Sequence, residues 1–359
     1  MILPVRGVVC RYRKVWVKAK FMSALEKVNI TFSERCNLRC PFCVCDAFSF
    51  SQERLTTCDW LKFIDEASAQ QVFTIGISGG EPFVLPGLRQ IIDRIVSGRM
   101  RFYIITNGSC IDDSLLEHIA ATKRCDFMQF SLDGFEADHD TIRGAGVFKK
   151  ATTAIKKAQT LGIKVAVNSV IARQNNHDLL EFATFLEELG VISYRLNLVS
   201  AKNLDLAPGY QPISAKSLAR MIADFVPHFK RFPHLHSLSP QKLYWRQLRN
   251  PRPDDDSFEV CIAPATELAV RPDGMIIPCG GANEVILGSI GQNTLAELWN
   301  SKKALAFQKR LAKGSAREAA RCVECPYRYY CRKYCPAVSA KRYCRKELAA
   351  YLREFGVLS

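Results

Sequence analysis

Three cysteines within eight positions constrain this chain more than any other feature of its sequence. They are Cys36, Cys40 and Cys43, and they come shortly after the apolar run 28–32. Thiolates on one short loop can ligate three irons of a [4Fe–4S] cube and leave the last iron open for a substrate or cosubstrate. The alternative is a zinc site that borrows a fourth cysteine from elsewhere in the chain. The spacing therefore predicts a metal centre, with an open coordination position if the metal is iron.

The total number of cysteines also favours metal or redox chemistry. The chain has 15 cysteines, an odd number, and basic residues such as Arg6 and Arg11 interrupt its apolar N-terminus, so it shows no signal peptide. No later stretch reaches the length of uncharged apolar sequence that a membrane span needs. Disulfides are rare in the cytosol. We therefore expect a cytoplasmic protein without membrane contact, whose cysteines bind metal or serve redox chemistry.

The net charge of +15 is concentrated at the two ends of the chain. Residues 1–20 carry six basic and no acidic side chains, and residues 300–359 carry fifteen Lys or Arg against four Asp or Glu. A basic end is compatible with nucleic acid, but the sequence lacks the aromatic signatures of RNA-binding modules. Basic residues can instead offset the negative charge of cysteine-ligated clusters or attract an acidic peptide. We expect no nucleic-acid partner.

Strand and helix patterns alternate through the first two hundred residues. The expected strands are 28–32, 72–78, 102–106, 126–132, 164–171 and 193–199. The expected helices between them are 56–70, 88–96, 112–122, 148–161 and 178–189, and a further helix over 214–230 follows the last strand. This alternation predicts βαβ units with a parallel sheet. Six such units form an incomplete barrel, whose chemistry we expect at the C-terminal ends of its strands.

Two further motifs stand at such strand ends. Gly79-Gly80-Glu81 follows the second strand; its glycines allow a close backbone approach, and its carboxylate can bind an ammonium group. Ser131 ends the fourth strand, and Arg143 stands twelve residues beyond it. A guanidinium suits a carboxylate, which it can bind through two hydrogen bonds. The alternatives are an ordinary turn for the glycines and a surface position for the arginine.

A second cysteine framework occupies the last hundred residues. Twelve residues separate Cys261 from Gly274, and four separate Gly274 from Cys279. The remaining cysteines follow the order Cys322-x2-Cys325-x5-Cys331-x3-Cys335, and then Cys344. Seven cysteines at such spacings predict bound metal, as iron–sulfur clusters or, alternatively, zinc.

Together these motifs resemble the radical S-adenosylmethionine (SAM) superfamily, and the second framework resembles its C-terminal SPASM extension. The resemblance implies an α/β fold, a partial (β/α)6 TIM-like barrel with a small C-terminal iron–sulfur domain. The domains would be a basic segment over 1–25, the barrel over 26–200, a helical and Pro-rich linker over 201–257 and the auxiliary-cluster domain over 258–359.

The resemblance also assigns cofactors, namely SAM and three [4Fe–4S] clusters. Cys36, Cys40 and Cys43 would hold the cluster that binds SAM, and the outer and inner auxiliary clusters would use the C-terminal framework. The implied contacts to SAM are Phe42 for adenine, Asn168 for the ribose, Ser131 and Arg143 for the carboxylate, and Gly79, Gly80 and Glu81 for the amino group. The implied outer ligands are Cys322, Cys325, Cys331 and Cys344; the inner ligands are Cys261, Cys279 and Cys335, with one of Asp254, Asp255 and Asp256 or a substrate atom as the fourth.

The implied activity is that of an oxidoreductase or peptide maturase. Reductive cleavage of SAM would give a 5′-deoxyadenosyl radical that abstracts hydrogen from a ribosomally made peptide, leading to a crosslink, a thioether or a cyclisation. A flavodoxin- or ferredoxin-type protein would donate the electron. The 35 residues before Cys36 are too few for a leader-recognition domain, so we expect a separate leader-binding protein or none.

Two alternatives stay open at this point. The first is oxidation, epimerisation or rearrangement of a small molecule or a tetrapyrrole by the same radical chemistry. The second is a non-catalytic iron–sulfur electron carrier, which would need neither Glu81 nor Arg143. Sulfatase maturation is disfavoured, because those enzymes place an aspartate where Gly280 follows Cys279 here.

Overall fold

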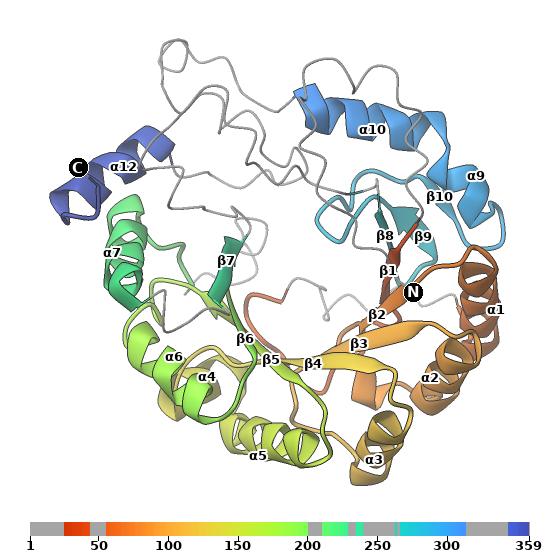
Figure 1. The fold of residues 1–359 in the computed structure, drawn as a ribbon, viewed down its shortest axis with the longest axis horizontal. Coiled ribbons are helices and arrows are strands. Elements are labelled where there is room, and N and C mark those ends of the chain that lie inside the picture. Colours follow the sequence, from red (N-terminus) through yellow and green to blue (C-terminus); the bar gives the residue numbers. More distant parts are fainter. Residues whose placement is uncertain are drawn as a thin grey trace, which may run out of the picture.

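A curved sheet, mostly of parallel strands, forms the body of the chain (Figure 1). The structure, a computed structural model, describes residues 25–43, 55–199, 210–228, 235–239, 263, 266–313 and 344–358. The strands in these residues make one ten-stranded sheet in the order β10-β9-β8-β1-β2-β3-β4-β5-β6-β7. From β1 to β7 each strand pairs in parallel with the next one along the chain. The expected partial barrel is therefore confirmed.

The barrel strands are short and are separated by helices on one face of the sheet (Figure 1). The strands are β1 (Lys27–Thr31), β2 (Thr74–Ser78), β3 (Arg101–Thr106), β4 (Cys125–Ser131), β5 (Val165–Ile171), β6 (Ser193–Leu198), β7 (Leu235–Ser239), β8 (Glu267–Val270), β9 (Met275–Ile277) and β10 (Gly288–Ser289). The helices are α1 (Thr57–Ala69), α2 (Leu88–Ser97), α3 (Asp113–Ala121), α4 (Glu136–Arg143), α5 (Val147–Thr160), α6 (Leu179–Glu188), α7 (Ala215–Phe225), α9 (Leu295–Trp299), α10 (Lys302–Lys313) and α12 (Arg345–Glu354), with 3-10 turns at Pro82–Val84 and Val226–His228.

Side-chain alternation explains how the sheet divides its two faces. Val28 and Ile30 of β1 are fully buried in the main hydrophobic core, whereas the intervening Asn29 is only partly buried. The same core contains buried residues from α1, α2, α3, α5, α6 and α7. Successive residues of a strand point to opposite faces, so the other residues line the inner side of the barrel. Polar groups of several strands thereby share one concave surface.

Helix starts follow the capping residues in the sequence. Thr56 accepts a hydrogen bond from the backbone of Asp59, and the Asp59 carboxylate accepts one from the backbone of Thr56, which completes a capping box before α1. Asp112 caps α3 in a similar way by accepting from the Leu115 backbone at 2.9 Å. Both helices begin within a residue of the expected position, because the caps satisfy N–H groups that have no partner within the helix.

Two elements were missed by the pattern analysis. Helix α4 lies between the expected strand 126–132 and the expected helix 148–161, where we expected no helix, although Glu136 and Asp138 in its first turn favour a helix start. Strand β7 lies inside the segment interpreted as a Pro-rich linker and pairs in parallel with β6. At the other edge, β8 pairs in parallel with β1, so the C-terminal part of the chain extends the barrel sheet.

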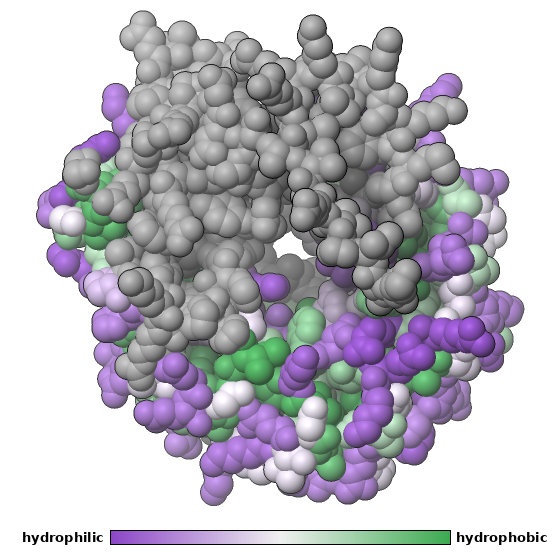
Figure 2. All heavy atoms as spheres, in the orientation of Figure 1, coloured by the Kyte–Doolittle hydropathy of each residue, from purple (hydrophilic) through white to green (hydrophobic). Residues whose placement is uncertain are grey.

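The face shown in Figure 2 is hydrophilic along the outer rim, and hydrophobic residues gather closer to its centre. Within the described residues, no helix is both long enough and apolar enough to cross a membrane. The basic segment 1–24, Asp254 to Asp256 and the cysteines at 261, 322, 325, 331 and 335 lie outside the described residues.

Candidate functional site

The cysteine loop leaves the C-terminal end of β1 and is fastened to the motif that follows β2. The backbone N–H of Gly80 donates to the Ser33 carbonyl at 2.7 Å, and that of Glu81 donates to the Arg35 carbonyl at 2.8 Å. A Cβ atom on Gly79 would lie 2.7 Å from the Ser33 carbonyl oxygen, and one on Gly80 would overlap the carbonyl oxygens of Glu34 and Arg35. The glycines therefore let two backbone segments of this chain meet, which is a structural role beside the predicted contact with SAM.

Polar hydrogens surround the sulfur atoms of the loop. The Leu38 backbone N–H and the Asn107 side-chain amide approach Cys36 Sγ at 3.4 and 3.8 Å. Arg143 Nη1 approaches Cys40 Sγ at 3.6 Å. Burial raises the pKa of Cys36 and raises that of Cys40 to about 11, although the Arg143 charge acts in the opposite direction at Cys40. Such thiols need a metal or another cation to hold them as thiolates.

The three thiols of this loop are a donor set that suits an iron–sulfur cube. Among the described residues, no group of three or more His, Cys, Asp or Glu side chains is arranged to hold a single metal ion. A cube binds each cysteine through a different iron, so its ligands need not converge. Negative charge on Cys36 or Cys43 would raise the pKa of Cys40 further.

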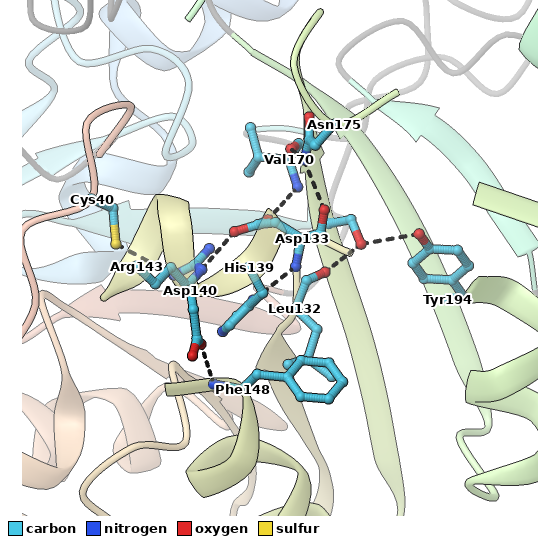
Figure 3. Close-up of polar contacts among 11 residues, drawn as sticks. Cys40, Leu132, Asp133, His139, Asp140, Arg143, Phe148, Val170, Asn175 and Tyr194 are labelled. Carbon is cyan, nitrogen blue, oxygen red and sulfur yellow. Dashed lines mark hydrogen bonds and ion pairs between the residues drawn. The ribbon is translucent and has the colours of Figure 1, made fainter. Parts of the chain in front are cut away.

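A buried ion pair lies directly behind Cys40. Arg143, at the last position of α4, donates from Nε to Asp133 Oδ2 at 2.6 Å, and the two side chains are 9% and 0% exposed. Figure 3 shows the Arg143 side chain directed toward both Asp133 and Cys40. Because Asp133 holds only Nε at this distance, the other guanidinium hydrogens are left for the sulfur and for a ligand. The helix missed by the pattern analysis is thus the element that positions the predicted arginine.

Asp133 connects several elements to this ion pair. Its Oδ1 accepts from the Val170 backbone at 2.8 Å, and its backbone carbonyl accepts from Asn175 Nδ2 at 2.8 Å (Figure 3). Its backbone N–H donates to His139 Nδ1 at 3.1 Å, and burial lowers the pKa of His139 to about 4, so this imidazole is neutral. Asp133 and Asn175 were not assigned roles from the sequence. The available signal was an Asp-Gly pair directly after a strand, which is equally typical of a turn.

Glu81 is almost completely buried and already has three internal donors. Its Oε1 accepts from Thr106 Oγ1 at 2.7 Å and from the Phe83 backbone at 3.2 Å, and its Oε2 accepts from the Asn107 backbone at 2.6 Å. Burial raises the pKa of Glu81 to about 7, although these hydrogen bonds oppose the shift. A carboxylate has roughly four acceptor positions. One position is therefore left for an ammonium group.

Asn168 and Ser131 lie side by side on the concave face, because they are paired across β4 and β5. Asn168 is 8% exposed, and its Oδ1 is buried with no hydrogen-bond partner. A buried acceptor without a donor is costly, so a hydroxyl donor from a bound cofactor fits this position. Phe42 is buried in a small apolar cluster with Ile142, and its ring meets that of Tyr210 edge to face at 5.6 Å.

Two cysteines of the second framework are described. Cys279 follows β9 and packs beside Ala282 and Phe307. Cys344 is exposed at the start of α12. Since the other ligands implied for both auxiliary clusters lie outside the described residues, the assignment of these clusters stays a prediction.

Two family models match this chain. The radical SAM superfamily model matches residues 30–186, which run from β1 into α6. A model described as an iron–sulfur cluster-binding domain, SPASM, matches residues 261–326.

Two individual proteins are similar to this chain in sequence. The mycofactocin maturase MftC of Mycobacterium tuberculosis is 35% identical over 157 residues, which cover 43% of this chain and 40% of that protein. The PqqA peptide cyclase of Granulibacter bethesdensis is 27% identical over 303 residues, 77% of this chain and 74% of the cyclase. The chain thus spans less than half of the first relative and about three quarters of the second.

A solved structure shows the same fold. Streptococcus suis SuiB bound to its precursor peptide SuiA superimposes with a TM-score of 0.70 at 18% identity, covering 91% of this chain and 76% of SuiB. At this identity the likeness concerns the fold alone. The predicted fold class, a partial barrel followed by an iron–sulfur domain, agrees with this likeness and with the two family models.

Proposed function

Since this chain belongs to the radical SAM superfamily and carries a C-terminal SPASM domain, we propose that it cleaves SAM reductively and modifies a ribosomally made peptide. When bound, the cluster at the cysteine loop supplies the electron that converts SAM to methionine and a 5′-deoxyadenosyl radical. The observation that carries the proposal is the buried Arg143–Asp133 pair, which places guanidinium hydrogens beside Cys40.

The residues of this chain bind and orient SAM. Arg143 presents its remaining hydrogens to the SAM carboxylate, and Ser131 at the end of β4 adds a hydroxyl. Glu81 offers its last acceptor position to the amino group, and Asn168 Oδ1 accepts from the ribose. Asp133 keeps the guanidinium in place through the packing of β4, β5 and α4. Orientation of this kind favours a single reaction geometry.

A peptide is the substrate class that the relatives favour. One relative is by name a peptide cyclase, and the superimposed SuiB structure holds a precursor peptide. The concave face of the sheet is lined by polar side chains such as Gln129, Asn168 and Asn197. Amide side chains on a groove wall can pair with a peptide backbone. We propose three [4Fe–4S] clusters, the number that the two cysteine frameworks can hold.

The test is a reaction with a candidate peptide under anaerobic conditions. The reconstituted protein is mixed with SAM, dithionite and a candidate precursor peptide, and the peptide mass and 5′-deoxyadenosine are measured. We expect a loss of hydrogen mass from the peptide that depends on SAM and is absent in Cys40→Ala. 5′-Deoxyadenosine without any peptide change, together with its increase on addition of a small-molecule extract, would favour the small-molecule alternative instead.

A further inference from the structure

The strands of the sheet carry few charged residues, and all but one of these form ion pairs. In the strands that the structure describes, the charged residues are two acids, Asp126 and Glu267, and three cations, Lys27, Arg101 and Arg195. Lys27 pairs with Glu267 at 2.5 Å, and Arg101 pairs with Asp126. Arg195 in β6 forms no ion pair with another described residue. Its guanidinium is therefore available to an anion from outside the sheet.

Arg195 lies on the concave side of the sheet. Its neighbours Tyr194 and Leu196 are buried in the main hydrophobic core, whereas Arg195 is exposed. Because successive residues of a strand point to opposite faces, a residue between two core residues belongs to the other face, inside the partial barrel. Figure 2 shows that the molecule is hollowed at its centre, which the strands of Figure 1 surround. Arg195 is thus on the side from which a substrate inside the barrel would be bound.

Arg195 also stands in one row with two residues of the proposed SAM site. Ser131 of β4 pairs with Asn168 of β5, and Asn168 pairs with Arg195 of β6. Neighbouring strands lie about 4.8 Å apart, so the backbones at Asn168 and Arg195 are separated by about this distance. In the proposed site Asn168 accepts from the ribose of SAM, and the ribose carries the carbon that becomes the radical. A group bound by Arg195 would accordingly lie close to the reactive carbon.

Asn197 adds an acceptor to the same face of β6. It lies two residues beyond Arg195 and pairs with Val170 of β5. Its Oδ1 is buried and has no hydrogen-bond partner. A buried acceptor without a donor is costly, so an N–H group of a bound molecule suits this position. Arg195 and Asn197 are about 7 Å apart along the strand. Together they suit a ligand that carries a carboxylate and a nearby N–H, as a peptide does.

SAM itself does not account for Arg195. The anionic group of SAM is its carboxylate, and the proposed site gives this group to Arg143, which Asp133 holds at 2.6 Å beside Cys40. The ribose and the adenine carry no negative charge for a second guanidinium to neutralise. The anion that Arg195 suits is therefore more consistent with the substrate than with the cosubstrate.

We propose that Arg195 binds a carboxylate of the peptide substrate close to the site of hydrogen abstraction, and that Asn197 accepts from a neighbouring peptide N–H. This inference rests on the proposed function, in which the substrate is a peptide. A guanidinium holds a carboxylate through two parallel hydrogen bonds, which fixes the orientation of the bound group as well as its position. The carboxylate belongs to an Asp or Glu side chain or to the C-terminus of the peptide, and both sources offer Arg195 the same chemistry.

The test measures how peptide binding depends on a carboxylate. The probes are three pools of short peptides with acetylated N-termini, randomised over uncharged residues except at a central position. The first pool has a central glutamate and amidated C-termini, the second has glutamine instead of the glutamate, and the third has glutamine and free C-terminal carboxylates. The immobilised, reconstituted protein is loaded with SAM, and the peptides that it retains are counted by mass spectrometry. We expect the parent to retain the first or the third pool about tenfold or more above the second, which identifies the source of the carboxylate.

Variants show whether this preference depends on Arg195. Arg195→Gln should retain the three pools alike, and Arg195→Lys should keep part of the preference, because lysine has the charge but not the planar fork. Asn197→Leu should lower the retention of all pools, since its acceptor serves the peptide backbone. The control is Arg89→Gln, which removes the same charge at an exposed position of the outer helix α2 and should keep the full preference. Equal retention of the three pools by the parent, or an unchanged preference in Arg195→Gln, would overturn the inference.

A second readout separates this inference from the proposed function. SAM binding by Arg195→Gln is measured by equilibrium dialysis, and we expect it to match the parent. Clearly weaker binding of SAM would place the guanidinium in the SAM site and would also overturn the inference. Formation of 5′-deoxyadenosine by the parent is then measured with dithionite. If the parent prefers the carboxylate pools through Arg195 but forms no 5′-deoxyadenosine, the proposed function fails and the peptide-binding site stands.

Discussion

Arg143 has two partners that a sequence pattern cannot reveal, the Asp133 carboxylate and the Cys40 sulfur. Its guanidinium can serve both and still offer hydrogens to a ligand, because its donors are fixed in one plane. A lysine has the same charge but would have to choose among these partners. The role of this position therefore depends on shape as well as charge.

Replacement of Arg143 tests that role. We expect Arg143→Ala to weaken SAM binding by roughly 1.5–3 kcal/mol, the range for lost hydrogen bonds to a charged group. Arg143→Lys should restore only part of the loss. Equilibrium dialysis with labelled SAM measures both variants, and Lys149→Ala, on a neighbouring helix, is the control. SAM binding by the alanine variant at the strength of the parent would show that Arg143 does not contact SAM.

The raised pKa of Glu81 leads us to expect that SAM binding depends on pH. Its pKa is raised from 4.5 to about 7, chiefly by burial, so its proton is lost as the pH rises through about 7. The folded chain binds this proton more tightly than the unfolded chain, and the contribution of Glu81 to stability accordingly falls between about pH 4.5 and about pH 7. An ammonium ligand prefers the ionised carboxylate, so SAM affinity should increase from pH 6 to pH 8, by at most about tenfold per unit. Glu81→Gln should flatten this profile; an unchanged slope would exclude Glu81 as the titrating group.

At the scale of the element, the loop after β1 and the turn after β2 form one unit. Two backbone hydrogen bonds join them, and the glycines leave room for the carbonyl groups of the cysteine loop. The position of the three cysteines therefore depends on a strand that contains none of them. This dependence gives the glycines a role that is separate from any ligand contact.

A Cβ atom on Gly80 should disturb this unit. Gly80→Ala would push the cysteine loop away from the end of β2, because the added carbon meets backbone atoms that cannot rotate away. We expect a loss of up to about four irons per chain after anaerobic reconstitution. Gly162→Ala is the control. Its Cβ atom would meet nothing within 4 Å, so this substitution strains only the backbone of residue 162, which has a positive φ. Full iron content in Gly80→Ala would mean that the loop does not rely on this contact.

The sequence predicts some elements well for physical reasons that are local. Capping residues such as Thr56 and Asp112 determine where helices begin, and strand alternation around Val28 and Ile30 identifies the buried face. Helix α4 was missed because six of its eight residues are polar and it has no long apolar stripe. The Asp133–Arg143 pair was missed because it joins residues ten positions apart through packing against β5, which no spacing rule describes.

On the scale of the whole molecule, the barrel sheet continues into the C-terminal part through β8. The cysteine loop after β1 and Cys279 after β9 therefore follow strands of one continuous sheet. The three predicted clusters follow from the sequence, but their geometry does not, because most of the auxiliary ligands lie outside the described residues. The number of bound irons and the cleavage of SAM are properties of the complete molecule.

The most direct measurement is the anaerobic cleavage of SAM by the reconstituted chain, with iron counted in the same sample. The account predicts about twelve irons per chain and equal amounts of methionine and 5′-deoxyadenosine after addition of SAM and dithionite. Simultaneous replacement of Cys36, Cys40 and Cys43 by Ala should leave about eight irons and abolish 5′-deoxyadenosine. A folded chain that binds zinc and no iron, or an iron-loaded chain that leaves SAM intact, would contradict it.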